Sequence, residues 1–508
     1  MANVTEAFGI CCLALSLGLG SKVSFPKDAI YTESLGSYYS LQETAVQPAC
    51  IVSPQTARDV STAVRILTKT NVSAQPGPIR SPSGCQFAVR SGGHASFAGA
   101  ANIAEGVTID LSGLSSLHLT TPSVDTKTAD QVAQPKLSVG VGATGGDVYS
   151  YLDALHLGVG GGRAAGVGVG GLTLGGGISY FGPRVGWTCD GVLNFEVVLA
   201  DGRLVNANEN ENPDLLWALR GGKNNLGIVT RIDLQTFPQG DLWGGQVVRP
   251  YETADKQMAA LAAFNDPERY DTSASLITTF AYSGAQDLQV VVNNMEYTKP
   301  VANPPVFNEL DSMPALSSTQ RVTNMSDLAA ETEGNDASGF SNSRVAGNRQ
   351  ASATLTIVSS VEAINATVSA WNASIGSIRA IPGIVWGLGM DPLPPQMYAR
   401  RAQSNALGLV NRKGKALIVV NLTVTWSNAA DDEAVDKAAR ALVAAIRRDV
   451  GGLDALDPFV YSNYAAPWQR PIESYGAASL ERLRRVKRVY DPRQVFTTLV
   501  PGGFKIPE

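Results

Sequence analysis

One of the three histidines of this 508-residue chain, His94, lies in the stretch VRSGGHASFAGA, which runs from Val89 to Ala100. A histidine in a glycine loop can be a metal ligand, a general base or an anchor for a covalent cofactor, because its ring nitrogens bind metals, exchange protons near neutral pH and act as nucleophiles. It can also be purely structural. The sequence around it has to decide between these roles.

Glycine accounts for 51 residues, about a tenth of the chain against a typical ~7%, and it clusters at Gly92–Gly93 and over Gly166–Gly177. Such clusters permit positive φ and close approach, and successive backbone N–H groups can form a nest for an anion. They predict a large phosphate-bearing cofactor, with tight structural turns as the alternative. The second cluster has no helix signal after it and no acidic residue at the Rossmann distance, and the chain has no GxxxxGK[ST] motif.

Four blocks of the sequence resemble the vanillyl-alcohol-oxidase superfamily of flavoproteins, which has a PCMH-type FAD-binding domain, and within it the berberine bridge enzyme-like branch. The blocks are RSGGH, GVGVGGLTLGGG, NPDLLWALRGGKNNLGIVT (Asn212–Thr230) and the terminal YSNYAAPW…YG…RLRRVKRVYDPRQVF. They follow the family's order and spacing from residue 43 to the end. SNALGL (Ser404–Leu409) and TVTW (Thr423–Trp426) resemble fungal members that act on secondary metabolites, and aromatic side chains there would stack on a substrate ring or belong to the core.

The resemblance implies an α+β fold. After an N-terminal segment (1–42), it implies a PCMH-type FAD-binding domain of two α/β subdomains (43–238). A substrate domain with an antiparallel sheet flanked by helices (239–454) follows, and a C-terminal segment (455–508) returns to the FAD domain.

By matching position, the resemblance implies that His94 bonds covalently to the 8α-methyl group of FAD; a non-covalent contact with the ring is the alternative. Tyr464, with Tyr461 nearby, is the implied catalytic base, although a phenol with a pKa of ~10 would need a cation or the flavin beside it, and a role as pocket wall stays open. No metal site is expected. The other implied cofactor-binding residues are Arg90, Ser91, Gly92, Gly93, Val167, Gly168, Gly170, Gly171, Gly176, Gly177, Gly227, Ile228 and Asn463.

Three positions bear on the chemistry. Ala164 stands where many relatives have a cysteine that attaches the flavin a second time, so a single attachment is predicted, and a carbohydrate oxidase is disfavoured. Ala466 stands where many relatives have an aspartate, which weakens the transfer of their acid–base machinery. Val167, at the position that screens the flavin from oxygen, is compatible with an oxidase.

The implied function is an FAD-dependent oxidase of a small, hydrophobic secondary metabolite. It would carry out alcohol oxidation, dehydrogenation or oxidative cyclisation, with hydride transfer to flavin N5 and reoxidation by O₂ to H₂O₂. A carbohydrate or oligosaccharide oxidase is one alternative, and a pericyclase-like catalyst with structural FAD is another. His118 and His156 match no motif and are interpreted as structural. The oligomeric state is not indicated.

Hydrophobic periodicity and turn residues predict the elements that carry these residues. Gly158–Gly182 is too rich in glycine for a regular element, Thr120–Pro135 is predicted as a loop, and Asp201-Gly202 as a hairpin turn. Helices are predicted over Thr56–Asn71, Asn212–Gly222 and Asp432–Val450, and a basic C-terminal helix is stopped by Asp491-Pro492. Strands are predicted over Phe87–Gly92, Gly106–Leu114, Gly227–Phe237, Asp287–Tyr297, Ala351–Ser360 and Ala416–Trp426.

A charged fraction of 17% and a net charge of −5 give no reason to expect nucleic acid or an anionic membrane as a partner; a small substrate and O₂ are expected. The apolar stretch Phe8–Leu19 is shorter than the ~20 residues of a membrane span. It is interpreted as a short amphipathic or buried helix, with a signal peptide as the alternative. No Lys or Arg precedes it, which favours an intracellular location, and the compartment stays open.

The five cysteines form no zinc-binding pattern, and an odd number leaves at least one thiol free. One bridge from the Cys11/Cys12 pair to Cys50 or Cys85 is compatible with an oxidising compartment, and reduced, buried thiols are the alternative.

Overall fold

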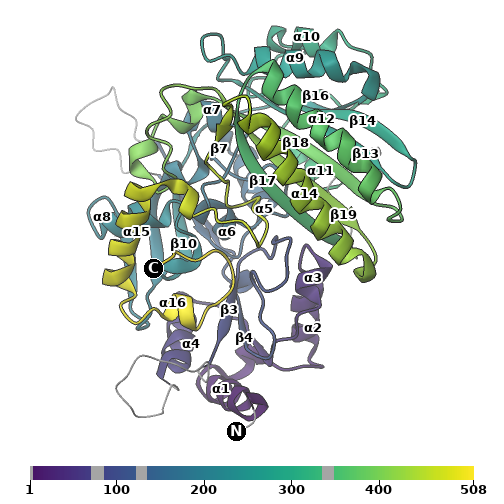
Figure 1. The fold of residues 1–508 in the computed structure, drawn as a ribbon. Coiled ribbons are helices and arrows are strands. Elements are labelled where there is room, and N and C mark those ends of the chain that lie inside the picture. Colours follow the sequence, from purple (N-terminus) through teal and green to yellow (C-terminus); the bar gives the residue numbers. More distant parts are fainter. Residues whose placement is uncertain (1–3, 70–84, 122–133, 335–347) are drawn as a thin grey trace, which may run out of the picture.

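The computed structural model of the protein describes residues 4–69, 85–121, 134–334 and 348–508. Its architecture is α+β, as predicted, and the described residues form a four-stranded, a five-stranded, a two-stranded and a large nine-stranded sheet (Figure 1). The smaller sheets and the C-terminal helices lie on one side of the molecule, and the large sheet with its helices lies on the other.

The first sheet has the strand order β1-β2-β4-β3, with β1 Val23–Ser24, β2 Cys50–Val52, β4 Val107–Asp110 and β3 Phe87–Arg90. Strands β2 and β3 both run parallel to β4, and helix α4 (Ala57–Lys69) lies between β2 and β3 in the chain. Val60, Val64 and Leu67 of α4 are fully buried, which is the i, i+4, i+7 spacing of one helix face. The predicted helix and both predicted strands are therefore confirmed.

The second sheet is antiparallel throughout, with the order β5-β6-β10-β8-β9. The predicted hairpin at Asp201-Gly202 is confirmed, since Leu199 N–H donates to Arg203 O over 2.9 Å between β8 and β9. Most of the predicted loop Thr120–Pro135 falls outside the described residues. The strands are β5 Leu117–Thr120, β6 Lys136–Gly140, β8 Val192–Val198, β9 Leu204–Asn208 and β10 Ile228–Gln235.

The nine-stranded sheet is antiparallel and contains all three strands predicted beyond residue 239. Helices α9 (Ala254–Phe264), α12 (Val361–Ile378) and α14 (Asp432–Gly451) cover one face (Figure 1). Phe280 and Trp371 are fully buried between this face and the helices. The strands are β12 Leu242–Pro250, β13 Ala274–Ser283, β14 Leu288–Tyr297, β15 Ser317–Ser318, β16 Arg321–Thr323, β17 Arg349–Val358, β18 Val385–Leu393, β19 Leu417–Trp426 and β20 Leu456–Asp457.

The glycine-rich stretch 158–182 contains a short helix, α6 (Val169–Leu174), where no regular element was predicted. Gly168 is its N-cap, and Val169 N–H donates to Ala143 O outside the helix over 3.0 Å. Tertiary packing thus overrides the low helix propensity of glycine. The other short helices are α2 Ala29–Gly36, α3 Leu41–Thr44, α5 Gly145–Asp153, α7 Gly182–Val185, α10 Asn308–Asp311, α11 Met325–Gly334 and α13 Pro395–Tyr398, and β7 Leu157–Gly158 pairs with β11 Phe237–Pro238.

The C-terminal segment packs beside elements far back in the chain. Helix α15 (Ala477–Tyr490) lies next to α8 (Pro213–Leu219) (Figure 1). The predicted stop is confirmed, because α15 ends before Asp491, whose carboxylate accepts the N–H groups of Val495 and Phe496 in α16 (Val495–Thr498), each over 2.8 Å.

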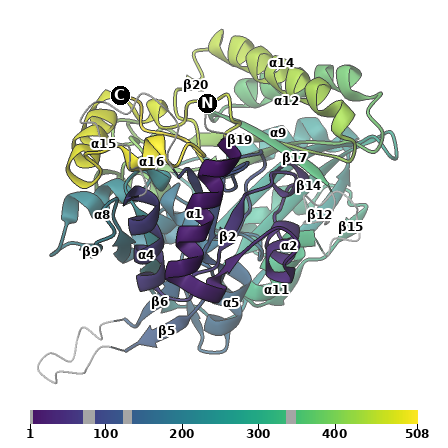
Figure 2. The same ribbon diagram turned by 90° about the horizontal axis from the view of Figure 1, so that it is seen from below.

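The apolar stretch near the N-terminus forms helix α1 (Val4–Leu19), which lies beside α4 (Figure 2). Cys11, Cys12 and Leu15 are buried, whereas Leu13 and Leu17 are exposed. This agrees with the interpretation as a half-buried helix. In the described part of the chain, no helix is long and apolar enough to cross a membrane.

Two disulfides join α1 to the first sheet, Cys11–Cys85 and Cys12–Cys50, and Cys189 is a buried free thiol. From the sequence we considered one bridge from this pair to Cys50 or Cys85, or reduced thiols; the structure has two bridges. Adjacent residues on a helix point about 100° apart, so that each sulfur reaches a different segment, and this direction is set only in the folded structure.

We predict that replacing Cys12 and Cys50 by alanine lowers the free energy of unfolding by about 2–4 kcal/mol, because the bridge restricts the unfolded chain across 38 residues. Urea unfolding under oxidising conditions measures the change. Added reductant should destabilise the unsubstituted protein. A Cys189→Ala control, which keeps both bridges, should lose as much stability on reduction as the unsubstituted protein does. A parent whose unfolding curve ignores reductant would contradict the bridges.

Candidate functional site

A cavity of about 490 Å³ lies where the glycine loops face the uncovered side of the nine-stranded sheet. It brings together most of the residues that the sequence singled out, from four distant parts of the chain. The predicted residues that line it are Ser91, Gly92, Gly93, His94, Val167, Gly168, Gly170, Gly171, Gly227, Ile228, Tyr461, Asn463 and Tyr464, and Ala164 lines it too.

The two glycine clusters meet at one wall of this cavity. A Cβ atom on Gly92 would lie 2.5 Å from Gly168 Cα, and one on Gly168 would lie 2.4 Å from Gly92 N, so that no other residue fits at either position. Ser91 Oγ donates to Val141 O over 2.5 Å and fixes the first loop. Peptide backbone without intervening side chains therefore forms this wall, as a nucleotide cofactor with phosphates requires.

Three predicted cofactor-binding residues do not line the cavity. Arg90 lies beneath the first loop, where it forms a buried ion pair with Asp110 over 3.4 Å and covers the ring of Tyr38 at 4.1 Å. Gly176 and Gly177 have φ of +107° and +86°, and a Cβ on Gly177 would lie 2.5 Å from Thr188 Cβ. Arg90, Gly176 and Gly177 therefore support residues that line the cavity and do not line it themselves.

The ring of His94 borders the cavity and stacks on Tyr39, with ring centroids 4.0 Å apart and an interplanar angle of 14°. His118 and His156 are exposed and lie outside the cavity. No group of three or more metal-ligating side chains occurs among the described residues. His94 is thus the histidine whose place suits a contact with a bound cofactor.

The opposite wall carries a buried charge pair that the sequence did not reveal. Arg163 donates to both carboxylate oxygens of Asp391, over 2.9 and 3.0 Å, and it also donates to the hydroxyl oxygen of Tyr464. Burial disfavours the Arg163 cation, but Asp391 and the neighbouring tyrosines Tyr464 and Tyr180 together outweigh burial and raise the pKa of Arg163. Because these residues lie 228 positions apart, only the fold could bring them together.

The tyrosines of this wall are protonated phenols in the cavity as it stands. Burial raises the pKa of Tyr464 well above its usual value, although the Arg163 guanidinium opposes the shift, and burial raises the pKa of Tyr461 to about 12. The two rings touch edge to face with centroids 4.9 Å apart. The sequence required a cation or the flavin beside Tyr464; Arg163 supplies a cation there, but burial has the larger effect and the pKa of Tyr464 stays raised.

A second cation, Lys223, borders the cavity next to the tyrosines. Its Nζ donates to Asn463 Oδ1, and Asn463 Nδ2 donates to Tyr461 Oη over 2.9 Å. Sequence reasoning missed Lys223, although a lysine inside the glycine-rich RGGKNNLG stretch is an available signal.

The floor of the cavity is the face of the nine-stranded sheet opposite helices α9, α12 and α14, and most of its lining side chains are polar, with Ile277 and Val292 as apolar exceptions. Trp426, by contrast, lies in the helix-side core with its Nε1 donating to Asp432 over 3.0 Å, so it is no substrate-stacking residue, and Ser404–Leu409 lies outside the lining. The polar floor residues are Gln246, Thr279, Asn294, Gln350, Ser352, Asp391, Asn421 and Thr423.

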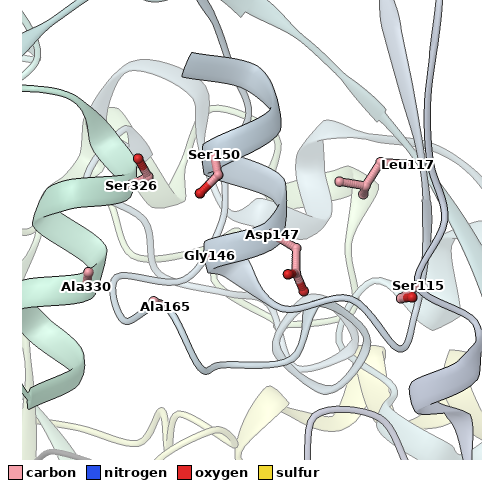
Figure 3. A pocket seen from close by; sticks show the side chains of 8 residues that line it. All are labelled: Ser115, Leu117, Gly146, Asp147, Ser150, Ala165, Ser326 and Ala330. Atoms are coloured by element: carbon pink, nitrogen blue, oxygen red, sulfur yellow. The ribbon is translucent and has the colours of Figure 1, made fainter. Parts of the chain in front are cut away.

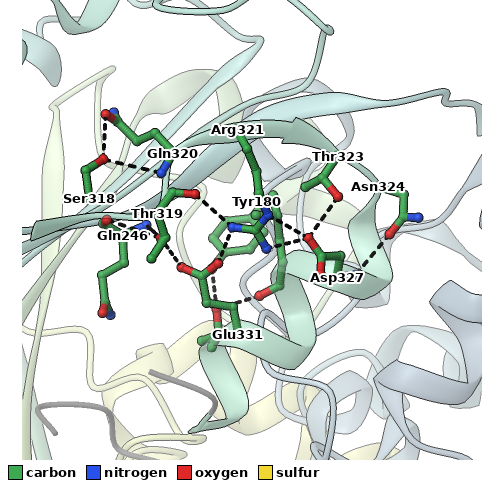
Figure 4. A network of polar contacts seen from close by, with 12 residues as sticks. Tyr180, Gln246, Ser318, Thr319, Gln320, Arg321, Thr323, Asn324, Asp327 and Glu331 are labelled. Atoms are coloured by element: carbon green, nitrogen blue, oxygen red, sulfur yellow. Dashed lines mark hydrogen bonds and ion pairs between the residues drawn. The ribbon is translucent and has the colours of Figure 1, made fainter. Parts of the chain in front are cut away.

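Helix α11 holds the glycine-rich segment against the cavity. Gly166 N–H donates to Glu333 over 2.8 Å and Ala165 N–H to Ala329 O over 3.0 Å. The helix itself is fixed by Arg321 of β16, which forms ion pairs with Asp327 and Glu331 (Figure 4). The Arg321 network is therefore a support for the cavity wall.

A separate hollow of about 540 Å³ lies between α5 and α11 (Figure 3). Its lining includes Ser115, Asp147, Ser150 and Ser326, and none of the predicted site residues. Asp147 is occupied there as part of the capping box of α5 with Thr144. We therefore assign the functional site to the cavity of about 490 Å³ that His94 and Tyr464 line.

The chain matches two family models, an FAD binding domain over residues 48–208 and a berberine and berberine-like model over residues 460–498. It is 36% identical to the FAD-dependent monooxygenase sdcF of Emericella nidulans over 100% of this chain and 99% of that protein. This protein belongs to the FAD-linked oxidoreductases of the berberine bridge enzyme-like branch. The FAD-binding model covers the glycine loops and Arg163, the berberine-like model covers the tyrosine pair, and Asp391 of the cavity lies between the two matched ranges.

Two further likenesses bear on this flavoprotein. It is 41% identical to Oligopeptidase PhomG' of Diaporthe leptostromiformis over 98% of its own length, but it spans only 37% of that relative. Its fold matches 6-hydroxy-D-nicotine oxidase of Arthrobacter nicotinovorans with a TM-score of 0.76 at 20% identity, covering 97% of this chain and 98% of that one. The latter likeness shows the fold alone.

We predict that Asp391→Asn lowers the free energy of unfolding by about 3–5 kcal/mol, since it leaves the buried Arg163 cation uncompensated. It should also change the absorption bands of the bound flavin, because the pair borders the cavity. Denaturant unfolding and visible spectra measure both effects. Asp457→Asn is the matched control: Asp457 forms a buried ion pair with Arg412 over 2.7 Å outside the cavity, so it should lose stability and keep the parent spectrum. Equal spectra for all three proteins would contradict this assignment.

Proposed function

We propose that this flavoprotein oxidises a small ring-bearing metabolite that carries hydroxyl or carbonyl groups, with FAD attached through His94 alone and O₂ as the electron acceptor. The carrying observation is that Tyr464, held by the Arg163–Asp391 pair, lines the same cavity as His94 and the polar side chains of the large sheet. The FAD-dependent monooxygenase relative supports the use of FAD and of O₂.

The residues of the cavity divide the work of holding the cofactor and the substrate. The glycine loops at Gly92 and Gly168 would hold the phosphates, His94 would anchor the ring, and Asn463 would orient it. Bound FAD supplies the chemistry of hydride acceptance and reoxidation by O₂. Ala164 lines the cavity and has no sulfur for a second bond, which supports single attachment.

Tyr464 would take the proton that the substrate hydroxyl gives up. Its phenol must first lose a proton, which burial opposes and the Arg163 guanidinium favours. Asp391 keeps Arg163 in place through two hydrogen bonds, so that the cation stays beside the phenol oxygen. The amides and hydroxyls of the floor would form hydrogen bonds with oxygen atoms of the substrate. The substrate is therefore proposed to be an oxygenated ring and not a plain hydrocarbon.

A carbohydrate oxidase is the second candidate, and the polar floor is the observation that favours it. Sugars require many hydrogen-bonding partners, and eight polar floor residues provide them. A screen for peroxide release against phenolic metabolites and against mono- and oligosaccharides separates the two candidates.

We predict that acid precipitation of the purified protein gives a yellow pellet with one FAD per chain, and that His94→Ala releases all flavin into the supernatant. The imidazole is the proposed point of attachment, and intact mass measures the bond. His156→Ala, at an exposed histidine outside the cavity, should keep the yellow pellet. Flavin in the supernatant of the parent protein would refute covalent attachment.

We predict that Tyr464→Phe lowers kcat by about 10²–10⁴, the range expected for loss of a general base, while FAD binding is retained because the ring stays in place. Steady-state peroxide release measures kcat and KM. If Tyr464 is instead a pocket wall, kcat will change less than tenfold and KM will carry the effect.

A further inference from the structure

Lys223 has no role in the function proposed above, yet its amine borders the same cavity. It begins a row of hydrogen bonds, from Lys223 Nζ to Asn463 and from Asn463 to Tyr461. Asn463 also donates to Leu172 O over 3.0 Å, which ties this row to α6. The amine is therefore held in place beside the tyrosines.

Charge balance sets Lys223 apart from the other ionisable residues of the lining. Arg163 and Asp391 neutralise each other, and Glu333 accepts the N–H of Gly166. Lys223, among the residues that the structure describes, forms no ion pair, and burial lowers its pKa to about 7. An amine in this state takes up a proton when negative charge is brought next to it.

The backbone gives an independent indication. Lys223 has a φ of +57°, in the left-handed region that glycine and asparagine adopt more easily than lysine does. It follows two glycines and precedes two asparagines, so the surrounding sequence is rich in residues suited to this conformation. The backbone conformation at this position favours glycine over lysine. A residue kept in an unfavourable backbone conformation is typical of functional positions.

The amine lies at the tyrosine end of the cavity and away from the meeting point of the glycine loops. A Cβ on Gly175, at the C-terminal end of α6, would lie 2.5 Å from Lys223 Nζ, whereas Gly168, at the opposite end of α6, packs against Gly92. The glycine end suits phosphates. The tyrosine end, where the substrate proton is handled, suits the flavin ring.

We propose that Lys223 tunes the bound cofactor: its ammonium group stands beside the flavin ring and stabilises the negative charge that the ring gains on reduction. The inference rests on the proposed function, in that FAD occupies this cavity. Hydride transfer from the substrate carries two electrons and one proton, which leaves one additional negative charge on the acceptor. A fixed cation beside that charge raises the reduction potential and makes the oxidation of the substrate more favourable.

The test is the two-electron midpoint potential of the holoenzyme, measured by equilibration with reference dyes. Lys223→Met should shift the equilibrium between reduced and oxidised flavin about tenfold toward the oxidised form, which lowers the potential by about 30 mV. Lys223→Arg should stay near the parent value because it keeps the charge. Lys223→Gly, which suits the positive φ, provides a folded protein without the amine and should match Lys223→Met.

Lys505 offers a matched control. It too is a buried lysine whose pKa burial lowers to about 7, and it donates to Asn224 over 3.1 Å, but it lies outside the cavity lining. Lys505→Met should therefore change stability and leave the potential unchanged.

Two results would overturn the inference while the proposed function stands: a parent potential in both Lys223→Met and Lys223→Gly, or an equal drop in Lys505→Met. A third would reassign the amine to the pyrophosphate. In a His94→Ala background, Lys223→Met would then weaken FAD binding about tenfold and leave riboflavin binding unchanged, with no change in potential. A parent protein purified without any flavin would instead refute the proposed function.

Discussion

The contact between the backbones of Gly92 and Gly168 is the constraint on which the rest of the site depends. These residues sit on loops that leave different elements, and a single methyl group on either would force the loops apart. The loop after Gly92 is held from behind by Glu43, whose carboxylate accepts the N–H groups of Gly99 and Ala101 over 2.8 and 2.6 Å. Burial raises the pKa of Glu43 to about 7.

The second constraint is the ion pair that crosses from the glycine-rich segment to the large sheet. A buried pair costs desolvation that its attraction barely recovers, so Arg163 and Asp391 are weak evidence for stability by themselves. Their value is positional, because together they fix the oxygen of Tyr464 at the cavity wall. Lys223 shows the opposite arrangement: burial lowers the pKa of its amine to about 7, and no carboxylate among the described residues forms an ion pair with it.

The two faces of the nine-stranded sheet explain why one fold serves both stability and recognition. Side chains alternate between the faces of a strand, so Thr279 of β13 points to the cavity and its neighbour Phe280 packs against Trp371 under α12. The helix face is mainly aromatic and aliphatic, although Asn293 there donates to Gln257 of α9, and the cavity face carries mainly amides, hydroxyls and Asp391. Because Trp426 lies on the helix face, it belongs to the core, although it ends the TVTW stretch in which substrate-stacking aromatics were considered.

Much of this protein was determined by local sequence. The period of apolar residues in α4, the Asp201-Gly202 turn and the strand patterns of β14, β17 and β19 predicted real elements, because each depends on neighbours within a few residues. The RSGGH and YSNY motifs likewise singled out residues that share one cavity. Only the tertiary structure decided several other features. These are helix α6, the second disulfide, the buried position of Arg90 beneath the first glycine loop, the Arg163–Asp391 pair and the hydrogen bonds of Lys223. Each of these features joins residues that are distant in the chain or depends on the direction in which a side chain points. Local sequence does not determine which distant residues meet or where a side chain points in the folded protein.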